Sequence, residues 1–220
     1  MSCRREQRAA TLPELSQAVQ DGDAGKARSL TAGLLAQGNR PEEILNHGLL
    51  NGMEKVGQRF KRSEIYIPEV LLAARSMNAC LEALKRELAG VGVKPVGKML
   101  IGTVKGDLHD IGKNLVKMMA QSAGIEVVDL GIDVSADAFL QGFRDNPDAR
   151  AIGMSALLTS TMTGMKEVIE RFDQEGLRSR VKFVAGGASF TGELAEDIGA
   201  DGYAPDAVSA SEKLKKLLRA

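Results

Sequence analysis

Apolar positions recur with a helical period through the first ninety residues. One segment, opened by Pro41, places apolar side chains at Ile44, Leu45, Leu49, Met53, Val56 and Phe60. Another, opened by Pro68, places them at Val70, Leu71, Ala74, Met77, Leu81, Leu84 and Leu88. Two shorter segments come first, one beginning at the capping sequence Thr11-Leu12-Pro13-Glu14 and one ending at Gly38-Asn39. Four amphipathic helices with short connections predict a small antiparallel bundle.

The pattern changes after residues 90–97, a stretch containing Gly and Pro that is typical of a linker. Short apolar runs then alternate with amphipathic segments, and we expect strands near 98–104, 125–130, 150–155, 181–185 and 201–203. Helices should fill the gaps, the last running from Pro205 to Leu218. Five such units predict a Rossmann-like (flavodoxin-like) five-stranded parallel sheet with helices on both faces. We therefore predict two domains, a helical one at 1–90 and an α/β one at 91–220.

Composition narrows the class of protein. The chain is 44% hydrophobic, and its 29 Lys+Arg balance 29 Asp+Glu, which argues against a general nucleic-acid binder. The two cysteines, Cys3 and Cys80, are far apart and fit a reducing cytoplasm, with Cys80 packed in a helix. No stretch is apolar enough to span a membrane, and residues 1–8 do not form a secretory signal. We expect a cytoplasmic protein without membrane or nucleic-acid partners.

The loop after the first predicted strand carries the candidate chemistry, because His109 lies there between Asp107 and Asp110. The spacing of Gly106 and Gly112 does not fit a Walker phosphate loop, and the three glycines of a dinucleotide fingerprint are absent. A hydrolytic metal site would need more ligands than the two carboxylates and one imidazole. From spacing alone, a thin metal site and a simple helix cap both remain open.

Three motifs then occur in an order that points to one family. Asp107-x-His109-x-x-Gly112 resembles the signature of the cobalamin-binding domain of methionine synthase and of the corrinoid proteins of methanol, methylamine and O-demethylase systems. Ser155-Ala156-Leu157 resembles its Ser-x-Leu element, and Gly186-Gly187-Ala188 resembles its double-glycine element. Each motif follows a predicted strand, where parallel sheets bind ligands. The resemblance extends over nearly the whole chain.

The resemblance implies a cobalamin cofactor, as methylcobalamin, hydroxocobalamin or a related corrinoid. His109 would be the lower axial cobalt ligand in place of the displaced nucleotide tail, the base-off/His-on state. Asp107 would hold the other ring nitrogen, and Thr161, with Ser160 as its neighbour, would continue a proton relay. The implied cofactor-binding residues are Gly106, Asp107, Leu108, His109, Asp110, Ile111, Gly112, Ser155, Leu157, Thr159, Gly186, Gly187, Ala188 and Tyr203.

The displaced tail would need a slot. Gly186 and Gly187 would line it, since an absent side chain permits close approach. Ser155 would offer a hydroxyl and Leu157 an apolar wall, while Tyr203 either borders the tail or simply packs.

The helical third resembles the cap that covers the upper face of methylcobalamin, through Met53-Glu54-Lys55-Val56-Gly57-Gln58-Arg59-Phe60 and Tyr66-Ile67-Pro68-Glu69-Val70. Phe60 and Ile67 would shield the methyl group from water. His47, the other histidine, is expected to be structural or solvated.

The function that follows is a methyl carrier, inactive alone, that alternates between cobalt(I) and methyl-cobalt(III). It would serve a substrate:corrinoid methyltransferase and a second methyltransferase with a pterin or thiol acceptor, with a reductive activating protein as a further partner. One alternative is an adenosylcobalamin-dependent sensor or regulator. Such proteins carry a Trp-containing cap and usually a DNA-binding segment, whereas this chain has no Trp and no basic recognition helix. Another is the small subunit of a mutase, which usually lacks a helical cap. A cofactor-free interaction domain would leave the three motifs unexplained.

Overall fold

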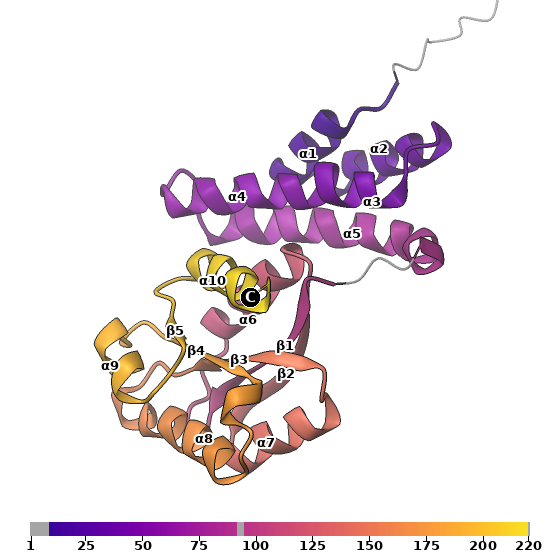
Figure 1. The fold of residues 1–220 in the computed structure, drawn as a ribbon. Helices are drawn as coiled ribbons and strands as arrows, with labels where there is room; N and C mark the ends of the chain where they lie inside the picture. Colours follow the sequence, from indigo (N-terminus) through magenta and orange to yellow (C-terminus); the bar gives the residue numbers. More distant parts are fainter. Residues whose placement is uncertain (1–8, 92–94, 220) are drawn as a thin grey trace, which may run out of the picture. The chain divides into compact units, whose positions relative to one another are not determined.

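The computed structural model describes residues 9–91 and 95–219, and the chain divides into two units, Met1–Val93 and Lys94–Ala220 (Figure 1). Cys3 and part of the predicted linker at 90–97 lie outside the described residues, as does the side chain of Leu88.

The first unit is helical, as predicted. Its elements are α1 (Leu12–Gln20), α2 (Ala24–Ala36), α3 (Pro41–Glu43), the π-helical segment η1 (Ile44–Leu50), α4 (Asn51–Lys61) and α5 (Ile67–Val91). Thr11 caps α1 through the predicted capping box, since its Oγ1 accepts from the Glu14 N–H at 3.3 Å. The helix expected from Pro41 is continuous through α3, η1 and α4, but the apolar period did not predict its π-helical middle.

The core of this unit follows the predicted apolar face with one correction. Val70, Met77 and Leu84 are buried, whereas Leu71 is 49% exposed. Each helical residue is turned by about 100° from its neighbour, and this turn carries Leu71 away from the face that Val70, Met77 and Leu84 share. Cys80 is fully buried in α5, as expected, and burial raises the pKa of its thiol.

The second unit contains the predicted parallel sheet. Its strands are β1 (Gly97–Val104), β2 (Ile125–Val134), β3 (Ala149–Ser155), β4 (Lys182–Gly186) and β5 (Gly202–Tyr203). They pair in the order β2-β1-β3-β4-β5, with every neighbouring pair parallel. The direction of the strand order changes between β1 and β3, and the crevice outside their carboxyl ends is where such sheets bind ligands.

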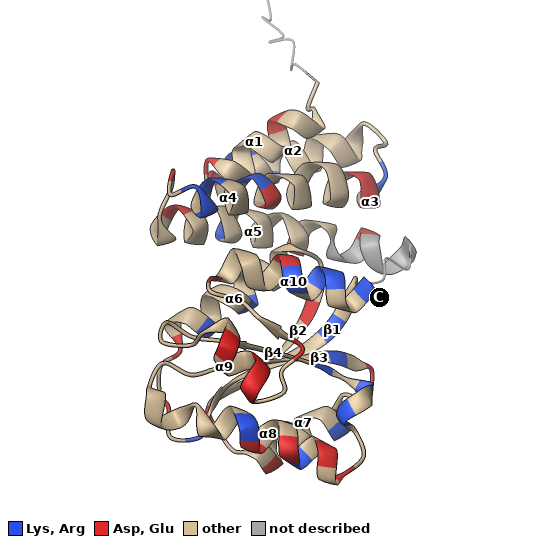
Figure 2. Ribbon diagram, turned by 60° about the vertical axis from the view of Figure 1, so that its left-hand side comes forward, with Lys and Arg blue, Asp and Glu red and all other residues tan. Residues whose placement is uncertain are grey.

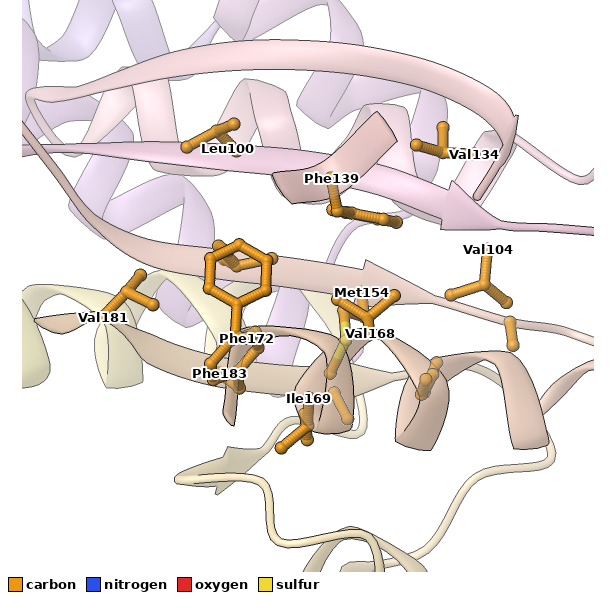
Figure 3. Close-up of a cluster of buried hydrophobic side chains, with 14 of the residues drawn as sticks. Leu100, Val104, Val134, Phe139, Met154, Val168, Ile169, Phe172, Val181 and Phe183 are labelled. Atoms are coloured by element: carbon orange, nitrogen blue, oxygen red, sulfur yellow. The ribbon is translucent and has the colours of Figure 1, made fainter. Parts of the chain in front are cut away.

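Helices cover both faces of this sheet. They are α6 (Ile111–Ser122), α7 (Ala136–Asp145), α8 (Thr163–Gln174), α9 (Gly192–Asp197) and α10 (Ala207–Arg219), with 3-10 turns η2 (Thr159–Thr161) and η3 (Arg178–Arg180). Figure 1 shows α7 and α8 on one face and α6 and α10 on the other. Under α7 and α8, the rings of Phe172 and Phe183 meet edge to face with centroids 5.2 Å apart (Figure 3).

The strand β2 runs past its predicted end at residue 130 and is irregular there. Two register shifts against β1 give β2 extra residues, and both Gly131 (φ 92) and Asp133 (φ 54) have a left-handed backbone. These bulges bring β2 to the same edge as the loop after β1.

Charges of both signs are interspersed along the helices (Figure 2), in keeping with the balanced composition. Within the described part of the chain, every helix is too short or too polar to cross a membrane.

Candidate functional site

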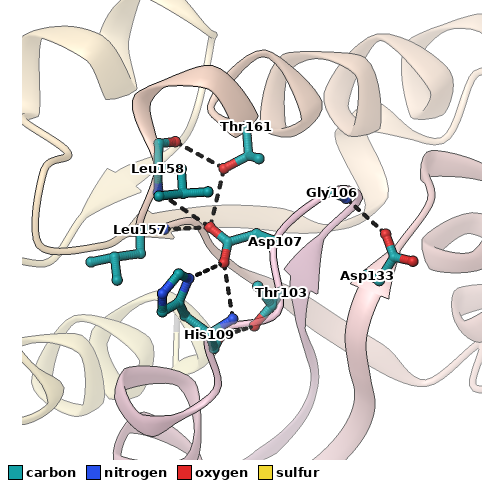
Figure 4. A network of polar contacts seen from close by, with 8 residues as sticks. All are labelled: Thr103, Gly106, Asp107, His109, Asp133, Leu157, Leu158 and Thr161. Carbon is teal, nitrogen blue, oxygen red and sulfur yellow. Dashed lines mark hydrogen bonds and ion pairs between the residues drawn. The ribbon is translucent and has the colours of Figure 1, made fainter.

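A buried carboxylate organises the loop between β1 and α6. Asp107 has no exposed surface, and both of its oxygens accept hydrogen bonds (Figure 4). Oδ1 accepts from the backbone N–H of His109 at 3.0 Å and lies 2.7 Å from its ring Nδ1. Oδ2 accepts from the N–H groups of Leu157 at 2.7 Å and Leu158 at 3.3 Å, and from Thr161 Oγ1 at 3.1 Å. One side chain therefore ties the loop to the segment that follows β3.

These donors keep Asp107 ionised. Burial by itself would raise the pKa of this carboxyl. The hydrogen bonds from His109, Leu157 and Leu158 outweigh that effect, so the pKa of Asp107 lies well below its ordinary range. An ionised carboxylate has no proton to give and can only accept.

The state of Asp107 fixes the tautomer of His109. Because Asp107 only accepts, the hydrogen of a neutral imidazole must lie on Nδ1, which leaves the Nε2 lone pair free. The His109 side chain is 53% exposed, so Nε2 is open to a ligand outside the loop. A buried carboxylate on one ring nitrogen and an open site on the other is the arrangement of a metal-ligating histidine.

The surface around His109 is unusually apolar for an exposed region. Leu108 is 68% exposed, Ile111 is 74% exposed and Leu158 is 43% exposed. Leu108 and Leu158 belong to the segments that Asp107 joins, and Ile111 begins α6 directly after the loop. Exposed apolar side chains grouped around a free imidazole indicate a surface that a large, flat, apolar group would cover.

Other predicted residues share this edge of the sheet. The strand register places Thr103, Ser155 and Gly186 side by side on β1, β3 and β4. A Cβ on Gly187 would lie 1.8 Å from the carbonyl oxygen of Ala156, so the approach of the two loops itself requires glycine there. Glycine at position 187 is therefore required by the packing of the chain itself, whatever ligand binds nearby.

Some expectations need correction or refinement. Packing within the chain does not require glycine at Gly112, because a Cβ there would meet nothing within 4 Å. Thr161, rather than its neighbour Ser160, donates to Asp107. Leu157 contributes its backbone N–H at this site, a role that was not predicted, and the apolar wall remains a prediction. Asp110 precedes α6 without a side-chain cap bond, and its carboxylate accepts from Asn114.

The remaining predicted residues lie near this edge or in the other unit. Thr159 and Ala188 are exposed, and Tyr203 is half-buried beside Phe190, with ring centroids 6.2 Å apart. In the helical unit, Phe60 is half-buried in α4 and Ile67 is 41% exposed at the start of α5.

His47 is exposed in η1. No group of three or more His, Cys, Asp or Glu side chains within residues 9–91 and 95–219 is placed to hold a metal ion.

Sequence reasoning missed three groups that hold the loop. Thr103 Oγ1 donates to the carbonyl of His109 at 2.9 Å, Asp133 Oδ1 accepts from the Gly106 N–H at 2.7 Å, and the Leu158 N–H contacts Asp107 (Figure 4). Only the Gly-Ile-Asp sequence at 131–133 carried a signal, because Gly and Asp favour left-handed turns at strand ends.

Comparison with known proteins identifies the family. Residues 97–212 match a family model described as a B12 binding domain, and residues 12–85 match a second model of the same description. The chain belongs to the B12-binding family. This corrinoid protein is 46% identical over 179 residues to dimethylamine corrinoid protein 2 of Methanosarcina mazei, a match covering 81% of this chain and 83% of the relative.

Two solved structures resemble the corrinoid protein over 94% of its length. A cobalamin-binding protein from Desulfitobacterium hafniense DCB-2 gives a TM-score of 0.80 at 29% identity, covering 98% of that chain. The methanol:cobalamin methyltransferase complex MtaBC from Methanosarcina barkeri gives 0.83 at 25% identity, covering 79% of the matched chain. The predicted family, fold class and corrinoid cofactor are thereby confirmed, and the chain is a corrinoid protein of methyltransferase systems.

The residues around His109 fit a corrinoid. A neutral imidazole suits cobalt, and the ring nitrogen that would bind it is free. The exposed apolar side chains around it and the open space beside Gly112 leave room for a broad macrocycle.

Proposed function

We propose that this corrinoid protein carries a methyl group in the base-off/His-on state, with His109 as the lower axial cobalt ligand. The observation that carries the proposal is the pairing of His109 Nδ1 with the buried carboxylate of Asp107 at 2.7 Å, which leaves Nε2 free. When bound, the cofactor would supply the methyl-transfer chemistry.

The protein's own contribution is to hold a proton and a ligand at one ring. With Nε2 on the metal, Asp107 would keep the hydrogen on Nδ1 and strengthen the imidazole as a donor. A ring whose Nε2 holds no metal could hold a proton there instead, which is the relay role that the resemblance implies for His109, Asp107 and Thr161. Thr161 has a single hydroxyl hydrogen, which it can give to Asp107 or to the Leu158 carbonyl 2.8 Å away. By changing its acceptor, the Thr161 hydroxyl can add or remove one hydrogen bond to Asp107 as the charge of the His109 ring changes.

The other predicted roles are part of this proposal. Residues 91–220 would bind the corrinoid, with Ser155, Gly186 and Gly187 along its displaced tail. Residues 1–90 would form the cap domain, in which Phe60 and Ile67 exclude water from the methyl group.

The methyl donor we propose is a methylamine, with dimethylamine as the first to test. The support is the name of the relative at 46% identity, a dimethylamine corrinoid protein. A substrate:corrinoid methyltransferase would load the carrier, a second methyltransferase would unload it, and a reductive activating protein would rescue oxidised cobalt. The MtaBC complex supports a methyltransferase as a direct partner.

An absorption spectrum tests the axial ligand. The full chain is incubated anaerobically with hydroxocobalamin and desalted, beside His109→Ala and a matched control, His47→Ala. His47 is the other histidine and lies exposed in the helical unit. We expect wild type and His47→Ala to share one spectrum and His109→Ala to differ from both.

Two outcomes would contradict the proposal. A His109→Ala spectrum identical to that of wild type would remove His109 as the ligand while leaving corrinoid binding intact. A folded wild-type chain that retains no corrinoid would remove the carrier function itself.

A further inference from the structure

The segment from Gly106 to His109 is held at both ends by residues outside the motif. Inside it, two backbone N–H bonds are local, since the Asp107 N–H donates to the Val104 carbonyl at 3.1 Å and the His109 N–H donates to Asp107. The Asp107 side chain ties the middle of the segment to Leu157, Leu158 and Thr161. Leu108, between Asp107 and His109, is 68% exposed. Beyond these bonds of Asp107, the backbone at the two ends of the segment is held by two further side chains.

Asp133, on the irregular end of β2, holds the first end with two bonds of opposite direction. Its Oδ1 accepts from the Gly106 N–H at 2.7 Å (Figure 4), and its own N–H donates to the Asp107 carbonyl at 3.1 Å. The second bond depends on the left-handed backbone of Asp133 at φ 54, which the bulge in β2 produces. Asp and Asn adopt this conformation more readily than most other residues.

Thr103, on β1, holds the other end. Its side chain is fully buried, and its Oγ1 donates to the His109 carbonyl at 2.9 Å. That carbonyl lies before α6 begins, so the helix does not provide its partner. The bond fixes the backbone from which the imidazole projects.

We propose that Asp133 and Thr103 are positioning residues that bracket the loop and set His109 relative to Asp107. This inference rests on the proposed role of His109. The bond from Gly106 is exposed, so losing it should change the loop locally and the free energy of unfolding little. A ligand displaced by a fraction of an ångström binds its metal less well, which makes the effect visible in the cofactor.

The test separates the hydrogen bonds from the backbone shape. In the full chain, Asp133→Gly keeps the left-handed conformation but loses the acceptor, whereas Asp133→Asn keeps both. Thr103→Val keeps the shape of the side chain and loses the hydroxyl, whereas Thr103→Ser keeps the hydroxyl. Asp148→Gly is the control, because that carboxylate pairs with Lys98 at the opposite end of β1.

We expect Asp133→Gly and Thr103→Val each to bind hydroxocobalamin about tenfold more weakly, the lower end of losses for outer partners of metal ligands. Each should also reduce the His109-dependent part of the spectrum. Asp133→Asn, Thr103→Ser and Asp148→Gly should match wild type. In the cofactor-free protein, the Gly106 amide should exchange its hydrogen faster in Asp133→Gly alone.

Two results would overturn the proposal. One is an Asp133→Gly variant that retains wild-type affinity, spectrum and Gly106 exchange. The other is an Asp133→Asn or Thr103→Ser variant that binds hydroxocobalamin as weakly as Asp133→Gly or Thr103→Val, respectively. That result would show that the acceptor or the hydroxyl is not the cause. If His109→Ala and wild type gave the same spectrum, the axial-ligand role would be refuted instead. The exchange rate of the Gly106 amide in Asp133→Gly would still test whether Asp133 holds the loop.

Discussion

At the scale of single residues, Asp107 is a carboxylate whose accepting capacity is fully used. Oδ1 faces two donors from His109, and Oδ2 faces Leu157, Leu158 and Thr161. Buried and surrounded by donors, the side chain cannot rotate without leaving several N–H groups unpaired, which costs free energy. The orientation of His109 is therefore set by the fold, before any cofactor binds.

Replacing Asp107 with Asn should reverse the tautomer of His109. The amide would point its oxygen at Leu157 and its NH2 at the ring, so Nδ1 must accept and the hydrogen moves to Nε2. We expect the free energy of unfolding to fall by about 2 kcal/mol, because one N–H of His109 then faces a donor. Urea unfolding measures the first effect, and the absorption spectrum should show loss of the His109 ligand. A His-ligated spectrum in Asp107→Asn would contradict this reasoning.

Two glycines of the site should respond in opposite ways to alanine. Gly187→Ala would drive a Cβ to 1.8 Å from the Ala156 carbonyl oxygen, and we expect it to lower the free energy of unfolding by about 3 kcal/mol. Gly112→Ala meets no atom within 4 Å and should raise the free energy of unfolding by roughly 0.5 kcal/mol, since alanine favours helix.

If the corrinoid covers Gly112, the alanine variant should nevertheless bind it more weakly. Thermal or urea unfolding without cofactor, followed by titration with hydroxocobalamin, measures both quantities on the same samples. An unchanged affinity in Gly112→Ala would exclude close contact between the cofactor and this residue.

At the scale of elements, a charged cluster fastens α6 to β2. Lys113, only 3% exposed, donates to Asp129 at 2.7 Å and to Asn114 at 2.9 Å, and Lys117 approaches the other oxygen of Asp129 at 3.0 Å. Burial would raise the pKa of Asp129, but the Lys113 hydrogen bond and further donors lower it to about 2. The helix that begins at the loop is thus anchored by charge as well as by its apolar face.

This anchor gives a pH-dependent stability. The folded pKa of Asp129 lies below its ordinary 3.8, so the stabilisation is complete above about pH 4 and is lost as pH falls towards 2. We expect Asp129→Asn to lose about 2 kcal/mol at pH 7, with the difference from wild type shrinking below pH 4. Urea unfolding between pH 7 and pH 3 measures it. Asp145→Asn, whose carboxylate accepts from Gln141 on α7, is the surface control. A difference that stayed constant with pH would show that charge is not the cause.

The elements also show how far sequence patterns reach. The five strands and their order of appearance could be predicted because each buried strand is a distinct apolar run between polar turns. The π-helical turns of η1 could not, since an inserted residue changes geometry without changing composition. The bulges of β2 left only the signal of Gly and Asp at 131–133. The roles of Thr103 and Asp133 could not be predicted for a related reason, because the alignment of the strands in space decides which groups they bond.

At the scale of the whole molecule, two units of one chain each match a B12-binding model. The motif on the α/β unit could be predicted together with its neighbours at the sheet edge, since parallel strands bring their carboxyl ends together. The predicted roles of Phe60 and Ile67 in the helical unit remain predictions.

The cap prediction can be tested with light. Methylated corrinoid protein should lose its methyl group faster in Phe60→Ala and Ile67→Ala than in wild type, because a less complete apolar cover admits water and oxygen. Leu72→Ala provides a matched control, since Leu72 is also an exposed apolar residue of α5, at 51%. The rate is read from the absorption change under constant illumination. Equal rates in all four proteins would mean that Phe60 and Ile67 serve only the helical packing.

The buried thiol of Cys80 makes the helical unit separately observable. The sequence holds cysteine only at positions 3 and 80, so after Cys3→Ser a thiol-reactive probe has a single target. With no exposed surface and a raised pKa, that target reacts only when α5 comes loose from its neighbours. The rate of alkylation therefore measures how often the helical unit opens by itself.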